Sequence, residues 1–259
     1  MIGTVHVTDR GAVRVHTYVA PDASVNVTSH VVETPHSLVV VDAQFLGRFA
    51  DEVVELTRDL GKPVDRVVIT HAHPDHYAGA GHFDAPKHAL PVVIDQIRAR
   101  GDVQDPTGTT VALRDVLPTQ ALEPGTTVID GVPFVFEAVS GGEAPDQLVV
   151  KLPEQRVAIV QDLVYNHIHL FLGDDDIPGW RRAVAVLAAD PGYDVVLPGH
   201  GQPTTPAVYA EVERYLATAA EVLGDDGDAY EAAITERYPD YDGTFVIDIA
   251  NRYLFGAGH

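Results

Sequence analysis

The strongest constraint on this fold is a short run of histidine and aspartate directly after a buried strand. Residues 67–69 read V-V-I, an apolar run typical of a strand that is covered on both faces. Residues 70–76 follow without a break and read T-H-A-H-P-D-H, which places four potential metal ligands within six residues. A catalytic metal also needs ligands from distant segments. The fold therefore has to bring further donor residues next to the end of this strand.

The spacing within the run favours two neighbouring metal positions. His71 and His73 are two residues apart, which sends both imidazoles to one side of an extended segment. Pro74 ends the extension, and Asp75 and His76 enter the first turn of a helix. One pair can then bind one cation and the next pair a second. The alternative is a solvated, histidine-rich turn without metal.

Composition limits the available ligands and partners. The chain has 259 residues with 13 histidines and no cysteine, so any metal must be held by histidine and carboxylate groups. The net charge of −21 argues against nucleic acid and anionic membrane surfaces as partners. The first residues, M-I-G-T-V-H, lack the basic and apolar parts of a signal sequence, and no stretch has the length of a membrane span. We therefore expect a cytoplasmic protein with a small-molecule substrate, and a homo-oligomer is possible.

Hydrophobic periodicity predicts a mixed α/β chain in which strands followed by a helix and a strand occur twice, as in two similar halves that face each other. Strands are predicted at residues 5–7, 13–19, 31–33, 38–41, 67–69, 127–129, 132–139, 148–150, 157–160 and 194–197. Helices are predicted at residues 45–60 and 180–188, after Pro206, and near Tyr230 and Val246. Residues 9–11 are expected to turn and residues 101–110 to form a loop.

In the order of its motifs, the chain resembles the metallo-β-lactamase superfamily over residues 5–210. The resemblance rests on Asp42 after a strand, the cluster at 71–76, Asp162 after a strand, and His200 in the turn L-P-G-H-G. It implies an α/β (α+β) fold for residues 1–206, a four-layer αββα sandwich with a two-metal site between its sheets. Residues 207–259 are expected to form an acidic, helical C-terminal extension packed on the same domain.

The resemblance also implies how the metal ligands divide. The first metal would be bound by His71, His73 and Glu143, the second by Asp75, His76 and His200, and Asp162 would bridge the two. Asp42 stands at the family's structural aspartate position and is expected to orient the cluster through hydrogen bonds.

The third ligand departs from the common family pattern, which has a histidine in a turn like G-H-T-P-G. This chain has no histidine between His88 and His167, and the aligned stretch S-G-G-E-A-P-D-Q places Glu143 at that position. The E-A-P turn, nineteen residues before Asp162, is similar to that of the alkylsulfatase branch, whose members are longer and carry extra domains. A carboxylate suits Zn, Mn or Fe. The alternative is an exposed acid at this position, with Asp146 or a water as the ligand.

Three residues near the expected metals are candidate catalytic groups. Asp75 would combine a catalytic role with metal binding. Tyr165 follows Asp162 by three residues, where lactonases of the family keep a tyrosine that assists the substrate carbonyl; the alternative is a core tyrosine. His167 alternates with His169 beside the metal edge, so one of them could contact the substrate or replace the missing histidine. The alternative for this pair is a plain strand face.

Together these features predict a binuclear metal-dependent hydrolase, in which a metal-bridging hydroxide attacks a small ester, lactone, thioester, amide or sulfate ester. Two divalent metal ions are expected, Zn first, with Mn or Fe as alternatives. The rival hypotheses are an iron-dependent oxidoreductase, like the sulfur dioxygenases of this fold, and a non-catalytic metal-binding scaffold. No G-x-S-x-G occurs, so a serine hydrolase is unsupported. Specificity is expected in loops over the metals, at residues 21–30, 82–91 and 171–180.

Overall fold

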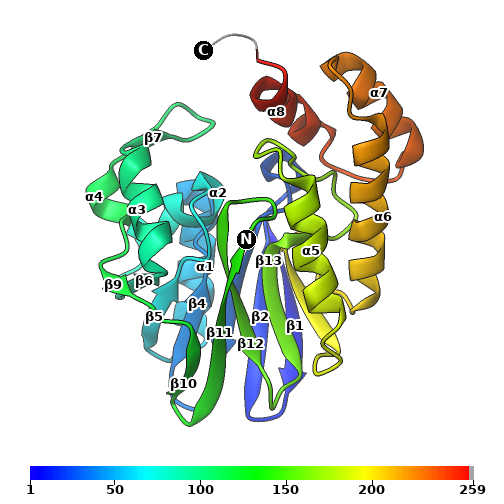
Figure 1. The fold of residues 1–259 in the computed structure, drawn as a ribbon. Coiled ribbons are helices and arrows are strands. Elements are labelled where there is room, and N and C mark those ends of the chain that lie inside the picture. The colour runs from blue at the N-terminus through cyan, green and yellow to red at the C-terminus, as the bar shows by residue number, and fades with distance from the viewer. Residues whose placement is uncertain (257–259) are drawn as a thin grey trace.

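Two large β-sheets form the centre of the structure, a computed structural model that describes residues 1–256 (Figure 1). In spatial order, the first sheet contains β1 (Thr4–Arg10), β2 (Val13–Val19), β3 (Thr28–Glu33), β4 (Leu38–Val41), β5 (Val64–Val68), β6 (Lys87–Ala89) and β9 (Gln120–Ala121). The second sheet contains β10 (Gly125–Ile129), β11 (Val132–Ser140), β12 (Asp146–Leu152), β13 (Val157–Tyr165) and β14 (Val195–His200).

The first sheet changes from antiparallel to parallel pairing at β4. Strands β1 to β4 pair as antiparallel neighbours, whereas β4, β5, β6 and β9 run parallel. Helix α1 (Gly47–Asp59) makes the crossover from β4 to β5. It buries Phe49 and Val53, four residues apart on one helical face, and it ends before Gly61, whose φ of 69° lies in the left-handed region.

The second sheet repeats this plan. Strands β10 to β13 are antiparallel, and β14 is parallel to β13 after a crossover through helix α5 (Ile177–Ala188). Asp176 caps α5, because its carboxylate accepts a hydrogen bond of 2.8 Å from the backbone N–H of Gly179. The repeat confirms the two similar halves that the order of strands and helices predicts. It also brings the carboxyl ends of β4, β5, β13 and β14 to one edge of the sandwich.

Helices cover the outer faces of both sheets (Figure 1). Helices α1 and α3 (Pro91–Arg100) lie on the first sheet, and α5 and α6 (Ala207–Val222) lie on the second. One apolar cluster fills the space between the sheets and under α1 and α3, and a second fills the space between the second sheet and α5 and α6. The four-layer αββα architecture is therefore confirmed.

The remaining short elements lie at the edges of these layers. They are α2 (Pro74–Tyr77), α4 (Leu113–Val116), α7 (Gly227–Arg237), α8 (Thr244–Leu254), the strands β7 (Val103–Gln104) and β8 (Thr110–Val111), and two 3-10 turns at 22–24 and 78–82. Helices α6 to α8 insert Leu216, Ile234 and Ile247 into the second apolar cluster. Within residues 1–256, no helix combines the length and apolar character that crossing a bilayer requires.

Most predicted strands and helices are confirmed, but the middle of the chain differs from expectation. The loop predicted at residues 101–110 contains the hairpin β7–β8, whose turn is closed by the Asp105 carboxylate accepting from the backbone N–H groups of Thr107 and Thr109. Helix α3 was not predicted, because its V-V-I run reads as strand-like; Pro91 at its first turn and Gly101 after its end set its limits. Strand β1 extends through Arg10, two residues into the expected turn.

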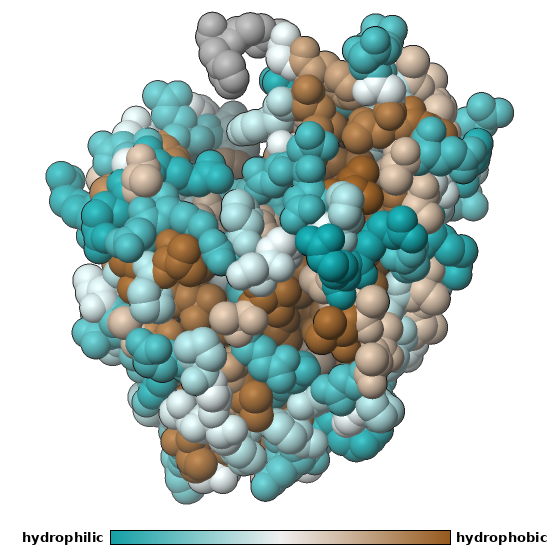
Figure 2. Space-filling view, in the orientation of Figure 1, coloured by the Kyte–Doolittle hydropathy of each residue, from teal (hydrophilic) through white to brown (hydrophobic). Residues whose placement is uncertain are grey.

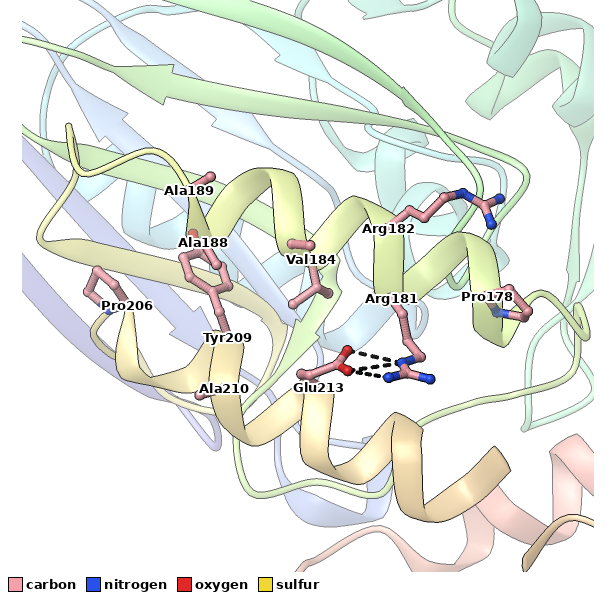
Figure 3. A pocket seen from close by; sticks show the side chains of 11 residues that line it. Pro178, Arg181, Arg182, Val184, Ala188, Ala189, Pro206, Tyr209, Ala210 and Glu213 are labelled. Atoms are coloured by element: carbon pink, nitrogen blue, oxygen red, sulfur yellow. Dashed lines mark hydrogen bonds and ion pairs between the residues drawn. The ribbon is translucent and has the colours of Figure 1, made fainter. Parts of the chain in front are cut away.

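A wide surface groove of about 760 Å³ lies between α5 and α6. Val184 of α5 and Tyr209 of α6 line it, and Arg181 forms an ion pair of 2.6 Å with Glu213 across the two helices (Figure 3). No histidine lines this groove, and none of the candidate ligands lies in it. The chemistry that the sequence predicts is therefore located elsewhere.

Candidate metal centre

The predicted ligands come together where the parallel strands of both sheets end. His71 and His73 lie in the segment after β5, Asp75 and His76 on α2, Glu143 in the turn after β11, Asp162 within β13, and His200 at the end of β14. One group of potential donors is His71, His73, Glu143 and Asp162, and another is Asp75, His76 and His200. Within each group, the ligand atoms all lie within 4.8 Å of one another.

The first group is compact and buried. Nδ1 of His73 lies 2.9 Å from Oε1 of Glu143. Nε2 of His71 lies 3.7 Å from Oε2 of Glu143 and 3.6 Å from Oδ2 of Asp162. Glu143 is buried, so the alternative of an exposed turn acid is wrong, and Asp146 does not take its place in the group.

Asp162 connects the first group to the second. Its Oδ1 lies 3.2 Å from Nε2 of His76, and its Oδ2 lies 3.2 Å from Nε2 of His200. Asp75 completes the second group, with its Oδ2 at 3.5 Å from Nε2 of His76 and 3.6 Å from Nε2 of His200. A single carboxylate between two sets of donors is the arrangement that a bridging ligand requires.

Four buried atoms at the centre have no hydrogen-bond partner among the described residues. They are Nε2 of His71, Nε2 of His76, Oε2 of Glu143 and Oδ1 of Asp162. Buried polar atoms are otherwise almost always satisfied, and four such atoms in one cluster mark a position for an ion. Imidazole nitrogens and carboxylate oxygens are ligands that Zn, Mn and Fe all accept, so the residues fit divalent cations.

The outward nitrogens of two imidazoles are fixed through Asp42. Nδ1 of His76 donates to Oδ2 of Asp42 over 2.9 Å. Nδ1 of His71 lies 3.0 Å from Oγ1 of Thr70, and that hydroxyl in turn donates to Asp42 over 2.7 Å. Both rings therefore carry a proton on Nδ1 and direct Nε2 into the centre. Asp42 thus has the orienting role that the sequence predicts for it.

The other two histidines are oriented in the same way by different partners. Nδ1 of His200 donates to the backbone carbonyl of Val25 over 2.8 Å, which leaves its Nε2 facing Asp162. Nε2 of His73 lies 3.4 Å from Oδ2 of Asp174, which leaves its Nδ1 facing Glu143. All four imidazoles therefore turn one ring nitrogen inward, as metal-binding histidines do.

Local backbone conformations around the centre are unusual. Asp42 and Gln161 have φ values of 59° and 43°, in the left-handed region that non-glycine residues seldom adopt. The Gln161 amide donates a hydrogen bond to the Asp42 carboxylate across the two sheets. Gly199 passes so close to Asp162 that a Cβ there would collide with the Asp162 carboxylate. Such features cluster at functional sites, where the surrounding fold compensates their cost.

The carboxylates create a strongly negative field in the centre. Burial disfavours protonated His73, but the carboxylates of Glu143 and Asp174 outweigh it and raise the pKa of His73 to about 10. Burial and the neighbouring Asp162 raise the pKa of Glu143 to about 7, although His73 opposes this shift. A divalent cation would relieve the same negative field that retains these protons, so metal binding is expected to release protons.

A buried histidine behind the centre gives a pH-dependent contribution to stability. His30 lies between the sheets, with Nε2 at 2.9 Å from Oε1 of Gln161 and Nδ1 at 3.0 Å from Oγ1 of Thr17. Burial lowers the pKa of His30 from 6.5 to about 4. Since the unfolded chain binds this proton more tightly, the stabilising contribution is complete above pH 6.5 and is lost as the pH falls toward 4.

We therefore expect the stability difference between the native chain and a His30→Gln variant to shrink on acidification. The expected decrease between pH 7 and pH 4 is on the order of 2–3 kcal/mol. Urea unfolding of both proteins in chelator, at a series of pH values, measures it. Taking the difference cancels the other titrating groups that the two chains share. A difference that stays constant with pH would contradict a neutral His30 in the folded state.

The three candidate catalytic residues are placed differently. Asp75 lies among the donors, as described. The Tyr165 hydroxyl is buried at the centre, 3.2 Å from Oδ2 of Asp162 and 3.5 Å from Oε1 of Glu143. His167 is exposed and its ring packs against Tyr241, with centroids 5.4 Å apart. Neither donor group contains His167, so it does not replace the missing histidine.

His169 also lies outside the centre. It is buried, and its Nδ1 lies 2.9 Å from the hydroxyl of Tyr215 on α6. Neither donor group contains it. The alternation of His167 and His169 therefore places the first in solvent and the second in the apolar cluster under α6. It does not indicate two metal ligands.

Several supporting residues were missed by the sequence reasoning. Thr70 and Gln161 each directly precede a predicted ligand, and this adjacency was an available signal. Asp174 and the Val25 carbonyl reach the centre from residues 171–180 and 21–30, two of the segments expected to form loops over the metals, but no local pattern distinguishes these two positions within them. A backbone carbonyl has no sequence signature, and Asp174 stands in an acidic run that reads as solvated surface.

Comparison with curated proteins finds two sulfatases. An alkyl/aryl-sulfatase of Saccharomyces cerevisiae is 28% identical over 225 residues, which cover 68% of this chain and 34% of that protein. A linear primary-alkylsulfatase of a Pseudomonas species is 26% identical over 223 residues, which cover 68% of this chain and 41% of that protein. The chain therefore spans less than half the length of either relative.

Solved structures and a family profile agree on the fold. A metallo-beta-lactamase from Pontibacter korlensis superimposes with a TM-score of 0.66 at 22% identity, covering 83% of this chain and 99% of that one. The DIM-1 metallo-beta-lactamase gives a TM-score of 0.62 at 18% identity, covering 83% and 98%. The profile of the Metallo-beta-lactamase superfamily matches residues 24–200. Since this match extends over more than half of the chain, the protein belongs to the metallo-beta-lactamase superfamily.

Proposed function

We propose that the protein is a binuclear metal-dependent hydrolase that cleaves a small ester, lactone, thioester, amide or sulfate ester. One observation carries the proposal: Asp162 of the first donor group also lies 3.2 Å from His76 and from His200 of the second. In addition, four inward atoms of the two groups have no hydrogen-bond partner among the described residues. A structural metal site needs only one closed set of ligands. Two adjoining sets with a shared carboxylate are typical of hydrolytic two-metal centres.

Different residues of the chain would bind the metals, orient the ligands and contact the substrate. When bound, two divalent cations would polarise the scissile group and lower the pKa of a water molecule toward about 7. The donors fix the positions of the cations, and the outward hydrogen bonds of the four histidines keep their lone pairs aimed inward. Burial and the charge of Asp162 raise the pKa of Tyr165 well above 10, so its hydroxyl stays protonated. Once cations bind Asp162 and Glu143, its present acceptors, that hydroxyl would be free to donate to an oxygen of the substrate.

Two observations bear on the metal and the substrate. Glu143 adds a third carboxylate to the donors, which favours harder cations such as Mn and Fe alongside Zn. The similarity to two alkylsulfatases supports keeping sulfate esters among the substrates. Because the chain covers only 34% and 41% of those proteins, their activity is a hypothesis for this chain.

Metal reconstitution followed by assay tests the proposal. The protein is stripped with chelator, reloaded with Zn, Mn or Fe(II), and its metal content is measured by mass spectrometry. We expect two ions per chain, and hydrolysis of at least one member of a panel of p-nitrophenyl acetate, an aliphatic lactone, a thioester and p-nitrophenyl sulfate. Chelator should abolish this activity. Turnover that survives complete metal removal, or iron-dependent oxygen consumption without hydrolysis, would overturn the proposal.

A further inference from the structure

Helix α8 is apolar on two faces, only one of which is covered. Its residues Val246, Ile247 and Ala250 are buried. On another face, Ile249 is 38% exposed and Tyr253 is 64% exposed. A surface helix is expected to be polar on its outer side, so a second apolar face needs a partner.

The exposed apolar side chains of α8 form a continuous line. Phe245, Ile249 and Tyr253 follow one another at intervals of four residues, which places them along one face of the helix. We call these three residues the α8 stripe. Phe245 is half-exposed and belongs to neither apolar cluster of the core. Figure 2 shows apolar surface over the region that α7 and α8 form in Figure 1, beside a hollow between this region and the lobe of α3 and α4.

Aromatic contacts connect this stripe to the candidate metal centre. The ring of Tyr253 packs edge-on against Phe171, with centroids 5.6 Å apart. Phe171 in turn packs edge-on against His73, with centroids 5.7 Å apart. Phe171 and Glu143 also line the same narrow crevice. The stripe therefore leads from solvent directly to the donors of the first group.

We propose that the α8 stripe and Phe171 bind the hydrocarbon chain of the substrate, while its reactive head lies at the metal centre. The inference rests on the proposed function, which places the head beside Glu143 and His73. The occupant is an unbranched alkyl or acyl chain, because the line of three side chains is narrow and presents no donor or acceptor except the Tyr253 hydroxyl. The continuity of Tyr253, Phe171 and His73 favours substrate over a protein partner.

A homologous series of substrates tests the proposal on the metal-loaded protein. The kcat/KM values of linear p-nitrophenyl esters, from acetyl to octanoyl, should rise about twofold to fourfold for each methylene that lies on the stripe. The affinities of linear alkyl hydroxamic acids of the same lengths, measured by calorimetry, should rise in parallel. This binding measurement does not depend on turnover.

Variants of the stripe provide the control. In an Ile249→Gln/Tyr253→Gln double variant, the ratio between octanoyl and acetyl compounds should fall toward one in both measurements. Val128→Gln is the matched control, because Val128 is 65% exposed but lies on β10, at the opposite end of the molecule from α8 (Figure 1). This variant should keep the native ratio. Circular dichroism verifies that the variants are folded.

The possible outcomes separate the two proposals. Hydrolysis of short esters without any chain-length dependence would overturn the substrate-chain inference and leave the proposed function intact. Chain-length-dependent binding that is lost in the double variant, without hydrolysis of any compound of the substrate panel, would support the inference and contradict the proposed function. A dimer in sedimentation experiments that dissociates in the double variant would assign the stripe to a second copy of the chain, and would also overturn the inference.

Discussion

Replacing Asp162 by asparagine is expected to lower kcat/KM by about a thousandfold or more, because the carboxylate that connects the first donor group to the second is lost. The neutral amide is nearly the same size, so the packing of β13 should change little. At the same time, the removal of one negative charge weakens the attraction for both cations. We therefore expect the metal content to fall from two ions per chain to one or none.

Metal analysis and steady-state kinetics of Asp162→Asn measure the two effects together. Asp146→Asn is the matched control. Asp146 stands three residues after Glu143, but among residues 1–256 its side chain accepts hydrogen bonds only from Gln96 and Ser140, and it belongs to neither donor group. It should retain two metals and native kinetics. Full metal content and activity in Asp162→Asn would contradict a bridging role for Asp162.

Replacing Asp42 by alanine is expected to destabilise the metal-free protein by about 3–5 kcal/mol. The Asp42 carboxylate is completely buried and accepts from the backbone N–H and hydroxyl of Thr70, from Nδ1 of His76 and from the amide of Gln161. Alanine leaves all of these donors without a partner inside the structure, and buried unpaired donors retain the full cost of their desolvation.

Urea unfolding in the presence of chelator isolates this effect from metal binding. Asp105→Ala is the matched control, since Asp105 accepts a similar number of hydrogen bonds from Thr107 and Thr109 at the surface. Water can replace its carboxylate there, so a loss of about 1 kcal/mol or less is expected. Equal losses in the two variants would contradict the special cost of the buried network around Asp42.

The ligand cluster was accessible from sequence because much of it is local. His71 and Asp75 lie within one short segment, so their proximity follows from chain connectivity alone. Asp162 and His200 were located by resemblance, and the strands before them explain why they arrive at the same edge. Glu143 was harder to predict, because the sequence around a glutamate in a turn does not indicate whether its side chain is buried. Its burial depends on how the two sheets pack.

The parts that escaped prediction depend on tertiary contacts. Whether Asp174 reaches His73 is decided by the path of the loop before α5, which periodicity does not describe. The outward turn of His167 follows from its left-handed backbone, with a φ of 58°, and a strand-like alternation cannot reveal this. Helix α3 was hidden because β-branched residues have strand-like preferences, which the packing of Val93 and Ile97 on the sheet overrides.

The location of the donors has a consequence for the lifetime of the protein in a cell. His71 and His76 follow a strand of one sheet, whereas Asp162 and His200 belong to the other. Each bound cation would therefore connect the two halves of the sandwich. By mass action, a free metal concentration a hundred times the dissociation constant adds about 2.7 kcal/mol of stability for each independent site. When the cation is scarce, the protein would lose this stability as well as its activity, and its unfolded form would be degraded by proteases more often. The abundance of the protein would therefore depend on the supply of metal.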